Sequence, residues 1–314
     1  MRPKNAFTKI ISDIPSYFLI LPAFVMTALF HYWPFYGIII AFKDFRPRQG
    51  IGGSEWTWNS ARTNNDAFYF FKQIFVDPDS IRAIRNTLII SSMKLLIMTV
   101  VIITMALMLN ELRNKLFKRS VQTIIYLPNF FSWVVMGSVI IGMFSVTTGI
   151  FNRFIVETLG GQPIPILTNP RYFRTLLYLS EIWKGAGFGS IIYMAAIAGI
   201  NPEQYESAII DGANRLQMAW HITLPGIKSV IWLLFLLSVS GILNAGFDQI
   251  FNLYTPSTMQ VGDIIDTFLF RKAFDGAGMF AYAGAIGISK QVIGVAVLLI
   301  MNYVATLTGE ESII

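Results

Sequence analysis

Four charged residues lie within long apolar stretches of the sequence: Lys94, Glu181, Lys184 and Lys290. A charge at membrane depth is costly, so such residues usually mark a solute path, a proton relay or an ion pair between helices. Glu181 and Lys184 are spaced to neutralise one another on one helix face, and Lys94 is placed to extend towards the outer headgroups. Lys290 lies nearest the centre of its stretch. These residues are candidates for a polar pathway or for pins between helices.

The composition places most of the chain in lipid. Its 314 residues are 54% hydrophobic and 13% charged, with a mean hydropathy of +0.57, whereas soluble proteins carry about 25% charged residues. The net charge is +6. Lysine and arginine in cytoplasmic loops explain this charge without nucleic acid as a partner.

Several enzyme classes are excluded by what the sequence lacks. Cysteine is absent, which rules out disulfides, thiolate metal sites and cysteine catalysis. His31 and His221 are the only histidines, so no metal site and no catalytic residue is expected. The sequence contains no P-loop pattern, and the glycines of 185–189 follow no strand, so neither ATP hydrolysis nor dinucleotide binding is expected of this chain.

Six segments are apolar over the roughly 20 residues that a membrane-spanning helix needs. They are 17–42, 87–109, 121–144, 176–199, 227–247 and 279–307. The predicted fold class is therefore an all-α membrane protein with six transmembrane helices. Along the chain we expect a tail at 1–16, the first helix at 17–42, a loop at 43–86, a five-helix core at 87–307 and a tail at 308–314.

Basic residues in the short flanks give the orientation. They lie in the N-terminal tail and in the 110–120 loop: Arg2, Lys4, Lys9, Arg113, Lys115, Lys118 and Arg119. Both regions are on one side if six helices alternate, and the positive-inside rule makes that side cytoplasmic. Both termini and the segment 200–226 are then cytoplasmic, and the loops 43–86, 145–175 and 248–278 are outside.

The 43–86 loop is long enough to carry structure of its own. Apolar residues recur in it at helical spacing, namely Phe68, Phe71, Ile74 and Phe75. This spacing predicts a short amphipathic helix on the outer membrane surface. Asp77-Pro78-Asp79 is expected to end that helix before the second span.

The stretch from Asn201 to Pro225 carries the clearest local pattern. Asn201 is a preferred N-cap residue, Pro202 suits the first helical position and Gln204 stands where a capping box places its partner. Gly212 supplies a left-handed stop. A short helix is predicted, then a second one, before Pro225 opens the fifth span. Helices this short need a surface to dock on.

Three groups of residues in this stretch match a known motif: Glu206-Ser207-Ala208, Gly212 and Ile222-Thr223-Leu224-Pro225. They reproduce the E-A-A, G, I-x-L-P loop of ABC importer permeases, with Ser207 where alanine is typical. From about Tyr17 to Leu307 the chain resembles the carbohydrate-uptake permeases of binding-protein-dependent importers, particularly the group that handles oligosaccharides and polysaccharide fragments. Further matching segments are His31-Tyr32-Trp33-Pro34, Ala41-Phe42-Lys43-Asp44-Phe45, Asn86-Thr87-Leu88, Tyr126-Leu127-Pro128, Tyr205–Ala213 and Gly246-Phe247-Asp248-Gln249-Ile250.

The resemblance implies a type I ABC importer transmembrane fold in the bacterial cell membrane, with both termini cytoplasmic. Such a chain is not an enzyme: it forms half of a translocation pathway for a carbohydrate. The implied partners are a second homologous permease, as a heterodimer, two ATP-binding subunits, an extracellular solute-binding protein and membrane lipid. No cofactor is implied in this chain, because ATP and magnesium belong to the ATPase.

The resemblance also implies roles for particular residues. The loop at 201–225 would couple to the ATPase through Tyr205, Glu206, Ser207, Ala208, Asp211, Gly212, Leu224 and Pro225. Glu206 is expected to make a charge-assisted contact with a basic residue of the ATPase. Asp211 opposes the helix dipole at its position, and the sequence leaves open whether it caps the second helix or contacts the partner.

A saccharide site combines aromatic platforms with amide and carboxylate partners. Candidates in or beside the fourth, fifth and sixth spans are Glu181, Trp183, Lys184, Tyr193, Asn244, Asp248, Gln249 and Lys290. Small residues suited to close helix packing accompany them, namely Gly185, Gly189, Gly241 and Ala245. The excess of intramembrane lysine over glutamate favours an anionic cargo such as a uronic-acid oligosaccharide.

Two alternatives remain open at this point. The first is a permease of the same kind whose cargo is a peptide, an amino acid or phosphate. The second is an intramembrane enzyme, which would need paired carboxylates or a nucleophile with its base at membrane depth. Glu181 is the single acid found there.

Overall fold

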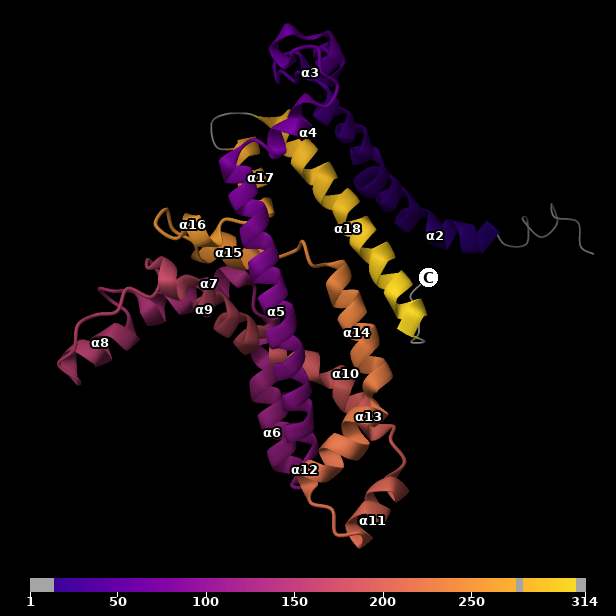
Figure 1. Cartoon of the computed structure of the whole chain (residues 1–314), viewed down its shortest axis with the longest axis vertical. Helices are drawn as coiled ribbons and strands as arrows, with labels where there is room; N and C mark the ends of the chain where they lie inside the picture. Colours follow the sequence, from indigo (N-terminus) through magenta and orange to yellow (C-terminus); the bar gives the residue numbers. More distant parts are fainter. Residues whose placement is uncertain (1–13, 275–278, 309–314) are drawn as a thin grey trace, which may run out of the picture. The chain divides into compact units, whose positions relative to one another are not determined.

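The computed structural model describes residues 14–274 and 279–308, and its regular structure is helical throughout these ranges (Figure 1). The predicted tails at 1–16 and 308–314 lie almost wholly outside the described residues. The chain divides into two compact units. The first comprises the residues up to Gln73 together with Lys272–Ile288, and the second comprises Ile74–Arg271 together with the residues from Ser289 onward.

The first unit contains the first predicted span. It consists of α2 (Ile14–Thr27), a π-helical turn η1 (Ala28–Tyr32) and a 3₁₀ helix η2 (Trp33–Phe42). The 28 residues Pro15–Phe42 are apolar enough to cross a membrane, and no residue of their most apolar window is buried within the chain. Side chains such as Phe18 and Leu19 are therefore placed to face lipid.

A small folded lobe follows the first span. It contains α3 (Gly50–Gly53), η3 (Thr57–Asn59) and η4 (Ala61–Thr63) around the buried side chain of Asp44. Asp44 accepts a hydrogen bond from Ser60 and forms ion pairs with Arg46 and Arg62. A buried carboxylate needs such partners, so this one ties three parts of the lobe together.

The predicted amphipathic helix is present as α4 (Tyr69–Ile74), but its apolar residues do not share one exposed surface. The rings of Phe68 and Phe71 pack on Phe42, and Ile74 is buried, whereas Phe75 is exposed. Packing on the end of the first span thus replaces part of the expected contact with the membrane surface.

The second span is longer than predicted. Helix α5 (Pro78–Asn110) has 33 residues, and the Asp77 side chain accepts a hydrogen bond from the Asp79 backbone N–H at its start. Asp77-Pro78 is therefore the N-cap and first helical position of α5 rather than the end of the preceding helix. The interpretation of this tripeptide as a stop signal was wrong.

The remaining helices of the second unit include two sharply bent pairs. The first joins α6 (Lys115–Tyr126) and η5 (Leu127–Phe130) to α7 (Trp133–Phe144) through a bend of 104°. The second joins α12 (Arg215–Met218), η7 (Ala219–Thr223) and α13 (Leu224–Gly226) to α14 (Lys228–Ser240) through a bend of 63°. The other elements are α8 (Ile150–Glu157), α9 (Pro170–Glu181), η6 (Ile182–Ala186), α10 (Gly187–Ala198), α11 (Pro202–Ile210), α15 (Phe247–Leu253) and α16 (Met259–Gly262). Two further helices, α17 (Ile265–Phe274) and α18 (Phe280–Thr308), have residues in both units.

By length and composition, the described helices provide three spans, or up to five if each bent pair crosses once. The three are 15–42, 78–110 and 280–307. The predicted span at 176–199 corresponds to α9, η6 and α10, a helical run outside this set, whose hydropathy Glu181 and Lys184 reduce. Pro225 does not open the fifth span as a straight helix, because it lies in α13, before the bend.

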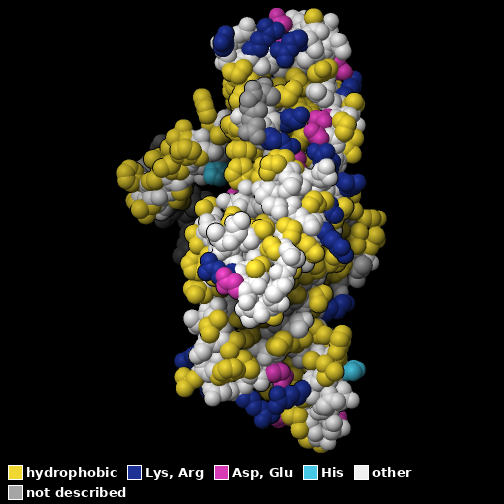
Figure 2. Space-filling model, turned by 90° about the vertical axis from the view of Figure 1, so that its left-hand side faces the viewer, with side chains coloured by type: hydrophobic (Ala, Val, Ile, Leu, Met, Phe, Trp, Pro, Cys, Tyr) yellow, Lys and Arg dark blue, Asp and Glu magenta, His cyan; other side chains and the backbone are white. Residues whose placement is uncertain are grey.

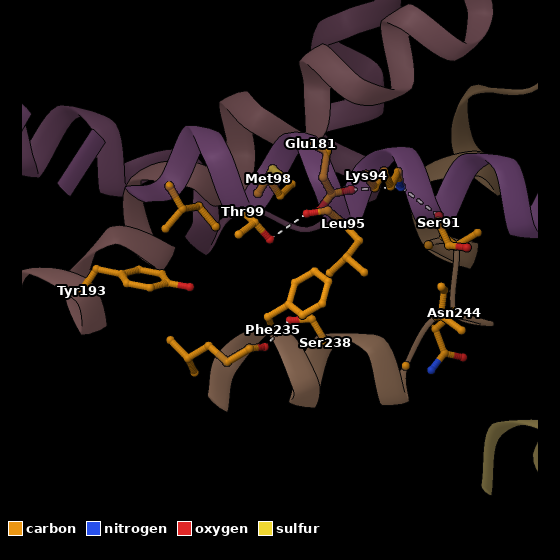
Figure 3. Close-up of a pocket in the computed structure, with 16 residues that line it drawn as sticks. Ser91, Lys94, Leu95, Met98, Thr99, Glu181, Tyr193, Phe235, Ser238 and Asn244 are labelled. Carbon is orange, nitrogen blue, oxygen red and sulfur yellow. Dashed lines mark hydrogen bonds and ion pairs between the residues drawn. The ribbon is translucent and has the colours of Figure 1, made fainter. Parts of the chain in front are cut away.

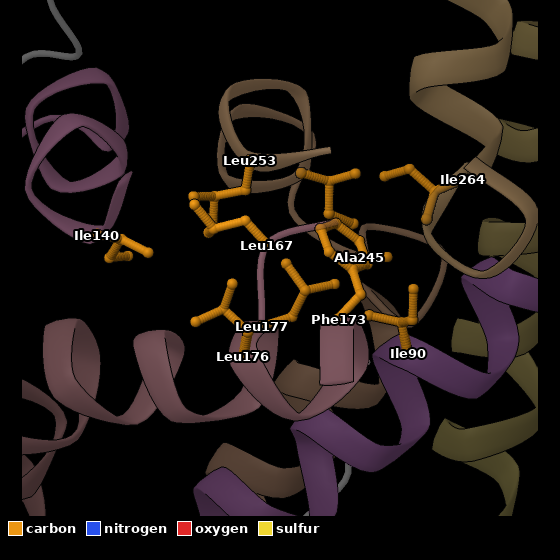
Figure 4. Packing of buried hydrophobic residues seen from close by; sticks show 10 residues of the cluster. Ile90, Ile140, Leu167, Phe173, Leu176, Leu177, Ala245, Leu253 and Ile264 are labelled. Atoms are coloured by element: carbon orange, nitrogen blue, oxygen red, sulfur yellow. The ribbon is translucent and has the colours of Figure 1, made fainter. Parts of the chain in front are cut away.

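A buried apolar cluster holds the helices of the second unit together (Figure 4). Ile90 of α5, Phe173 and Leu177 of α9, and Ile250 and Leu253 of α15 meet there. Close approach elsewhere depends on glycine, as the sequence predicted. A Cβ atom at Gly189 of α10 would lie 2.8 Å from Ile102 Cδ1 of α5, so the Ile102 side chain would have to shift to make room for a larger residue.

A hydrogen-bonded polar cluster around Asn86 of α5 positions the segment before α17. The Asn86 side chain is fully buried and donates hydrogen bonds to the backbone carbonyls of Gln260, at 3.1 Å, and Asp263, at 3.0 Å. The buried Asp263 carboxylate accepts hydrogen bonds from Arg271 at 3.0 and 2.6 Å. These hydrogen bonds raise the pKa of the Arg271 guanidinium. Asn86 therefore fixes the chain that returns from α15 towards α17.

Candidate functional site

The fifth predicted span is broken at its far end. Helix α14 ends at Ser240 and α15 begins at Phe247, so residues 241–246 are not helical. Gly246 has a φ of +94°, a left-handed conformation that favours glycine. Non-helical backbone at membrane depth is tolerated only where its polar groups find partners in the protein or line a cavity. The break therefore identifies a place to look for polar side chains.

Lys94 supplies those partners (Figure 3). Its ammonium donates to the Ala245 carbonyl at 2.8 Å and to the Gln249 side-chain oxygen, and it pairs with Glu181 at 3.1 Å. The Lys94 residue is only 9% exposed. The hydrogen bonds to these three acceptors, one of which carries the opposite charge, offset the desolvation cost of burying the ammonium. The interpretation of Lys94 as a residue that extends to the headgroups was wrong.

Gln249 is held so that its oxygen faces Lys94. Its side-chain nitrogen donates to the Leu177 carbonyl at 2.8 Å and to the Ser180 hydroxyl at 2.9 Å. The residue is fully buried. The amide of Gln249 thus connects α9, α5 and α15 through a single chain of hydrogen bonds.

A second ammonium holds the same break. Lys290 of α18 donates to Asp266 at 2.6 Å and to the Asn244 side-chain oxygen at 2.7 Å. Lys94 and Lys290 therefore bind neighbouring positions of the non-helical segment, and each is neutralised by one carboxylate. Both charges are ion-paired between helices.

A cavity of about 270 Å³ lies between α5, α10 and the broken span (Figure 3). Hydroxyl, amide and aromatic groups line it together with the Lys94–Glu181 pair, namely Ser91, Thr99, Tyr193, Phe235, Ser238 and Asn244. Ligand pockets usually enclose about 300–1,000 Å³, so this cavity has room for a small polar unit rather than a long chain.

The structure brings together some of the eight predicted pathway residues. Glu181, Tyr193 and Asn244 line the cavity. Gln249 and Lys290 lie behind its wall, where each contacts a lining residue.

The other three lie elsewhere. Trp183 is 45% exposed, and Asp248 is exposed at the start of α15. Lys184 donates to the carbonyls of Asn129, at 2.8 Å, and Phe131, at 2.6 Å. The expected Glu181–Lys184 pair is therefore wrong, because the π-helical turn η6 begins directly after Glu181 and changes the helical phase of Lys184.

Sequence reasoning left Lys94 out of the candidate saccharide site, although a signal was available. Thr87, Ser91 and Lys94 are spaced by four and three residues, which aligns them on one face of α5. All three are buried. A stripe of polar side chains along an apolar helix indicates the face that packs against other helices rather than lipid.

The loop at 201–225 has the predicted local structure at both ends of α11. The Asn201 side chain caps the helix by accepting from the Glu203 backbone N–H at 3.0 Å, and Pro202 is the first helical residue. Gly212 has a φ of +78°, which confirms the left-handed stop. The capping box, however, joins Asn214 to Gln217 rather than Asn201 to Gln204. Asn214 therefore caps the second helix, and Asp211 does not.

Two polar contacts tie this loop to neighbouring elements. The Tyr205 hydroxyl lies 3.0 Å from that of Thr223, which joins α11 to the turn before the fifth span. Arg215 pairs with Glu111 at the end of α5, at 3.1 Å. The outer surface of α11 remains open: Glu206 and Ser207 are exposed, and Ile209 and Ile210 are 61% and 86% exposed.

Comparison with known proteins identifies the family of this chain. Residues 98–307 match the family model described as binding-protein-dependent transport system inner membrane component. The chain belongs to this family. It is therefore a multi-pass inner-membrane transport permease rather than an enzyme, as the sequence predicted.

Relatives and solved structures cover nearly the whole chain. Protein LplB of Bacillus subtilis is 37% identical over 95% of this chain and 90% of its own length. The polygalacturonan/rhamnogalacturonan transport system permease protein YteP of Bacillus subtilis is 39% identical over 99% and 93%. A bacterial alginate ABC transporter, solved with an alginate pentasaccharide-bound periplasmic protein, aligns with a TM-score of 0.85 and 34% identity over 99% of this chain and 100% of that one. This similarity confirms the all-helical type I importer fold.

Proposed function

We propose that the chain forms half of the translocation pathway of an ATP-driven importer for oligosaccharides. The polar cavity at the broken fifth span is the observation that carries this proposal. Its tyrosine and phenylalanine rings, hydroxyls and amide are the groups that contact sugar rings and their hydroxyls. Its volume suits one sugar unit at a time, as a chain passes end-on.

The proposed cargo is an acidic oligosaccharide. The names of YteP and of the aligned alginate transporter refer to polymers that contain acidic sugars. The excess of intramembrane lysine gives less support than it did from sequence, because Lys94 and Lys290 are paired with Glu181 and Asp266. Lys184 donates to two carbonyls and lies over the Trp133 ring, and no ion pair of it is found among the described residues, so it is the proposed cation for a cargo carboxylate.

The proposed coupling runs through α11. Its exposed isoleucines and Glu206 would fit a cleft on an ATP-binding subunit, and a basic residue there would meet the Glu206 carboxylate. The contacts Tyr205–Thr223 and Glu111–Arg215 would transmit a pull on α11 to the fifth and second spans. Rigid-body rocking of transporter helices requires such stiff connections.

The proposed assembly contains four kinds of subunit besides lipid. A second homologous permease would complete the pathway as a heterodimer, two ATP-binding subunits would hold ATP and magnesium, and a solute-binding protein would deliver the cargo outside. This chain would hold no cofactor. Both of its termini would be cytoplasmic.

Uptake by the reconstituted transporter tests the proposal. Proteoliposomes with all cognate subunits should import acidic oligosaccharides in an ATP-dependent way, and Ser238→Phe, which fills the cavity, should abolish uptake. Ser138→Phe on the exposed side of α7 is the matched control and should leave uptake unchanged. Import of neutral sugars or peptides in place of acidic oligosaccharides would contradict the proposed cargo. Undiminished uptake by Ser238→Phe would contradict the proposed path.

A further inference from the structure

An apolar groove of about 460 Å³ runs between the end of α5 and the start of α6. Its lining residues are Val100, Val101, Thr104, Met105, Met108, Leu109, Leu112, Phe117, Val121 and Ile125. The one hydroxyl among them, on Thr104, donates to the Val100 carbonyl at 2.7 Å, so its polarity is already satisfied. The groove therefore offers almost purely hydrocarbon surface.

Four basic residues lie at the end of this groove: Arg113, Lys115, Lys118 and Arg119. They belong to the connection between α5 and α6 and to the first turns of α6. In the ranges that the structure describes, none of them takes part in an ion pair. The acid beside them, Glu111, is bound by Arg215. Figure 2 shows Lys and Arg side chains beside hydrophobic ones near its lower end, where α6 begins.

We propose that this groove binds an anionic phospholipid. One acyl chain would lie against Val101, Met105 and Val121, and the headgroup phosphate would meet the four basic side chains. Basic clusters next to spanning helices bind anionic headgroups through charge, and the groove adds a shape that a purely electrostatic cluster lacks. An anionic phospholipid matches this arrangement, because its acyl chain is apolar and its headgroup carries the negative charge.

The lining of the groove favours a lipid over a helix of a partner permease. Helices associate in membranes through small residues that let their backbones approach, whereas this wall carries Met105, Met108 and Phe117. Methionine side chains are flexible and adapt to irregular occupants. A partner helix would also leave the four cations without anions.

Lipid retention by the whole purified transporter tests this proposal. Native mass spectrometry of the complex, titrated with phosphatidylglycerol and separately with phosphatidylcholine of the same chains, should show preferential retention of phosphatidylglycerol. The triple variant Lys115→Ala, Lys118→Ala and Arg119→Ala should weaken phosphatidylglycerol binding by about tenfold or more. Val121→Trp, which fills the groove, should weaken binding of both lipids.

Basic residues far from the groove serve as the control. Lys72→Ala, Arg153→Ala and Arg171→Ala remove three exposed basic residues from segments predicted to be outside, and should leave retention unchanged. Equal retention of the two lipids by the unaltered complex, or unchanged retention by the triple variant, would overturn the proposal. Because the chain has no cysteine, Thr104→Cys offers a unique cross-linking site. A cross-link from it to a partner permease would show that protein covers the groove and would equally overturn the proposal.

Discussion

The ammonium nitrogen of Lys94 lies 2.9 Å from the place that a Cβ atom would occupy at Gly246. The two residues are far apart in the sequence, yet each requires the other. Lys94 can reach the Ala245 carbonyl because no side chain stands at position 246. Gly246 can take its left-handed turn because the backbone before it has a donor. The glycine and the lysine together hold the break in the fifth span.

Gly246→Ala should therefore destabilise the site through two separate effects. The methyl group would collide with the Lys94 ammonium, and the φ of +94° would add about 1–3 kcal/mol of backbone strain. We expect a lower melting temperature of the purified complex and a loss of uptake. Gly142→Ala in α7 is the matched control, because no atom lies within 4 Å of its Cβ position. Normal uptake by Gly246→Ala would show that the break does not depend on the contact between Gly246 and Lys94.

Removal of one partner of the Lys94–Glu181 pair should cost more than removal of both. Lys94→Met leaves the Glu181 carboxylate without its counter-ion on the cavity wall, where its side chain is 28% exposed. The cost should therefore lie below the about 3–5 kcal/mol that breaking a fully buried pair typically costs. The double variant Lys94→Met with Glu181→Leu should recover part of that loss. A double-mutant cycle on thermal unfolding of the complex measures the coupling. Additive effects of the two substitutions would contradict the ion pair.

Two substitutions in the loop at 201–225 should abolish transport without unfolding the protein. Glu206→Lys places the wrong charge on the exposed surface of α11, and Gly212→Val forces a β-branched residue to a φ of +78°. Both variants should abolish ATP-dependent uptake while the amount of protein in the membrane stays unchanged. Glu157→Lys, an equally exposed substitution at the end of α8, is the control. Normal uptake by Glu206→Lys would contradict the proposed contact with the ATPase.

Substitutions in the polar cluster around Asn86, which lies outside the cavity, should lower the stability of the protein. Asp263→Ala would leave the Arg271 guanidinium without its carboxylate, and Asn86→Ala would leave the Gln260 and Asp263 carbonyls without a donor. We expect Asn86→Ala to cost roughly 1–3 kcal/mol and Asp263→Ala to cost more. Thermal unfolding of the complex measures both. Asn252→Ala is the control, because its side chain donates only to a backbone carbonyl on its own helix. Unchanged melting of the Asp263→Ala variant would exclude a structural role.

The local features of the loop at 201–225 could be predicted from sequence, because a cap and a stop are determined by the residues that occupy them. Asn201, Pro202 and Gly212 each act on backbone groups within a few positions. The helical class and the close packing of Gly189 follow equally from composition and residue size. These predictions needed no knowledge of which helices are neighbours.

The partners of the buried charges could not be predicted in this way. Lys94 meets Glu181 and Gln249 across helices that are distant in sequence, so hydropathy along the chain carries no information about them. The same limit applies to Lys290 and Asn244. The break at 241–246 was also missed, because Ile242, Leu243 and Ala245 continue an apolar pattern that does not reveal a change of backbone conformation.

Residues 241–246 also bear on how selective the cavity can be for size. Helical backbone resists displacement because every shift breaks hydrogen bonds of the helix itself. This hexapeptide has fewer such bonds, among them the one from the Asn244 N–H to the Gly241 carbonyl at 2.8 Å, and two lysine side chains from α5 and α18 bind it in addition. If the proposed path is correct, a bulkier sugar would be admitted when the Lys94 ammonium moves aside, while both flanking helices stay intact. The tolerance of the transporter for branched or substituted cargo would then depend on the length and flexibility of a side chain as well as on the rigidity of the cavity walls.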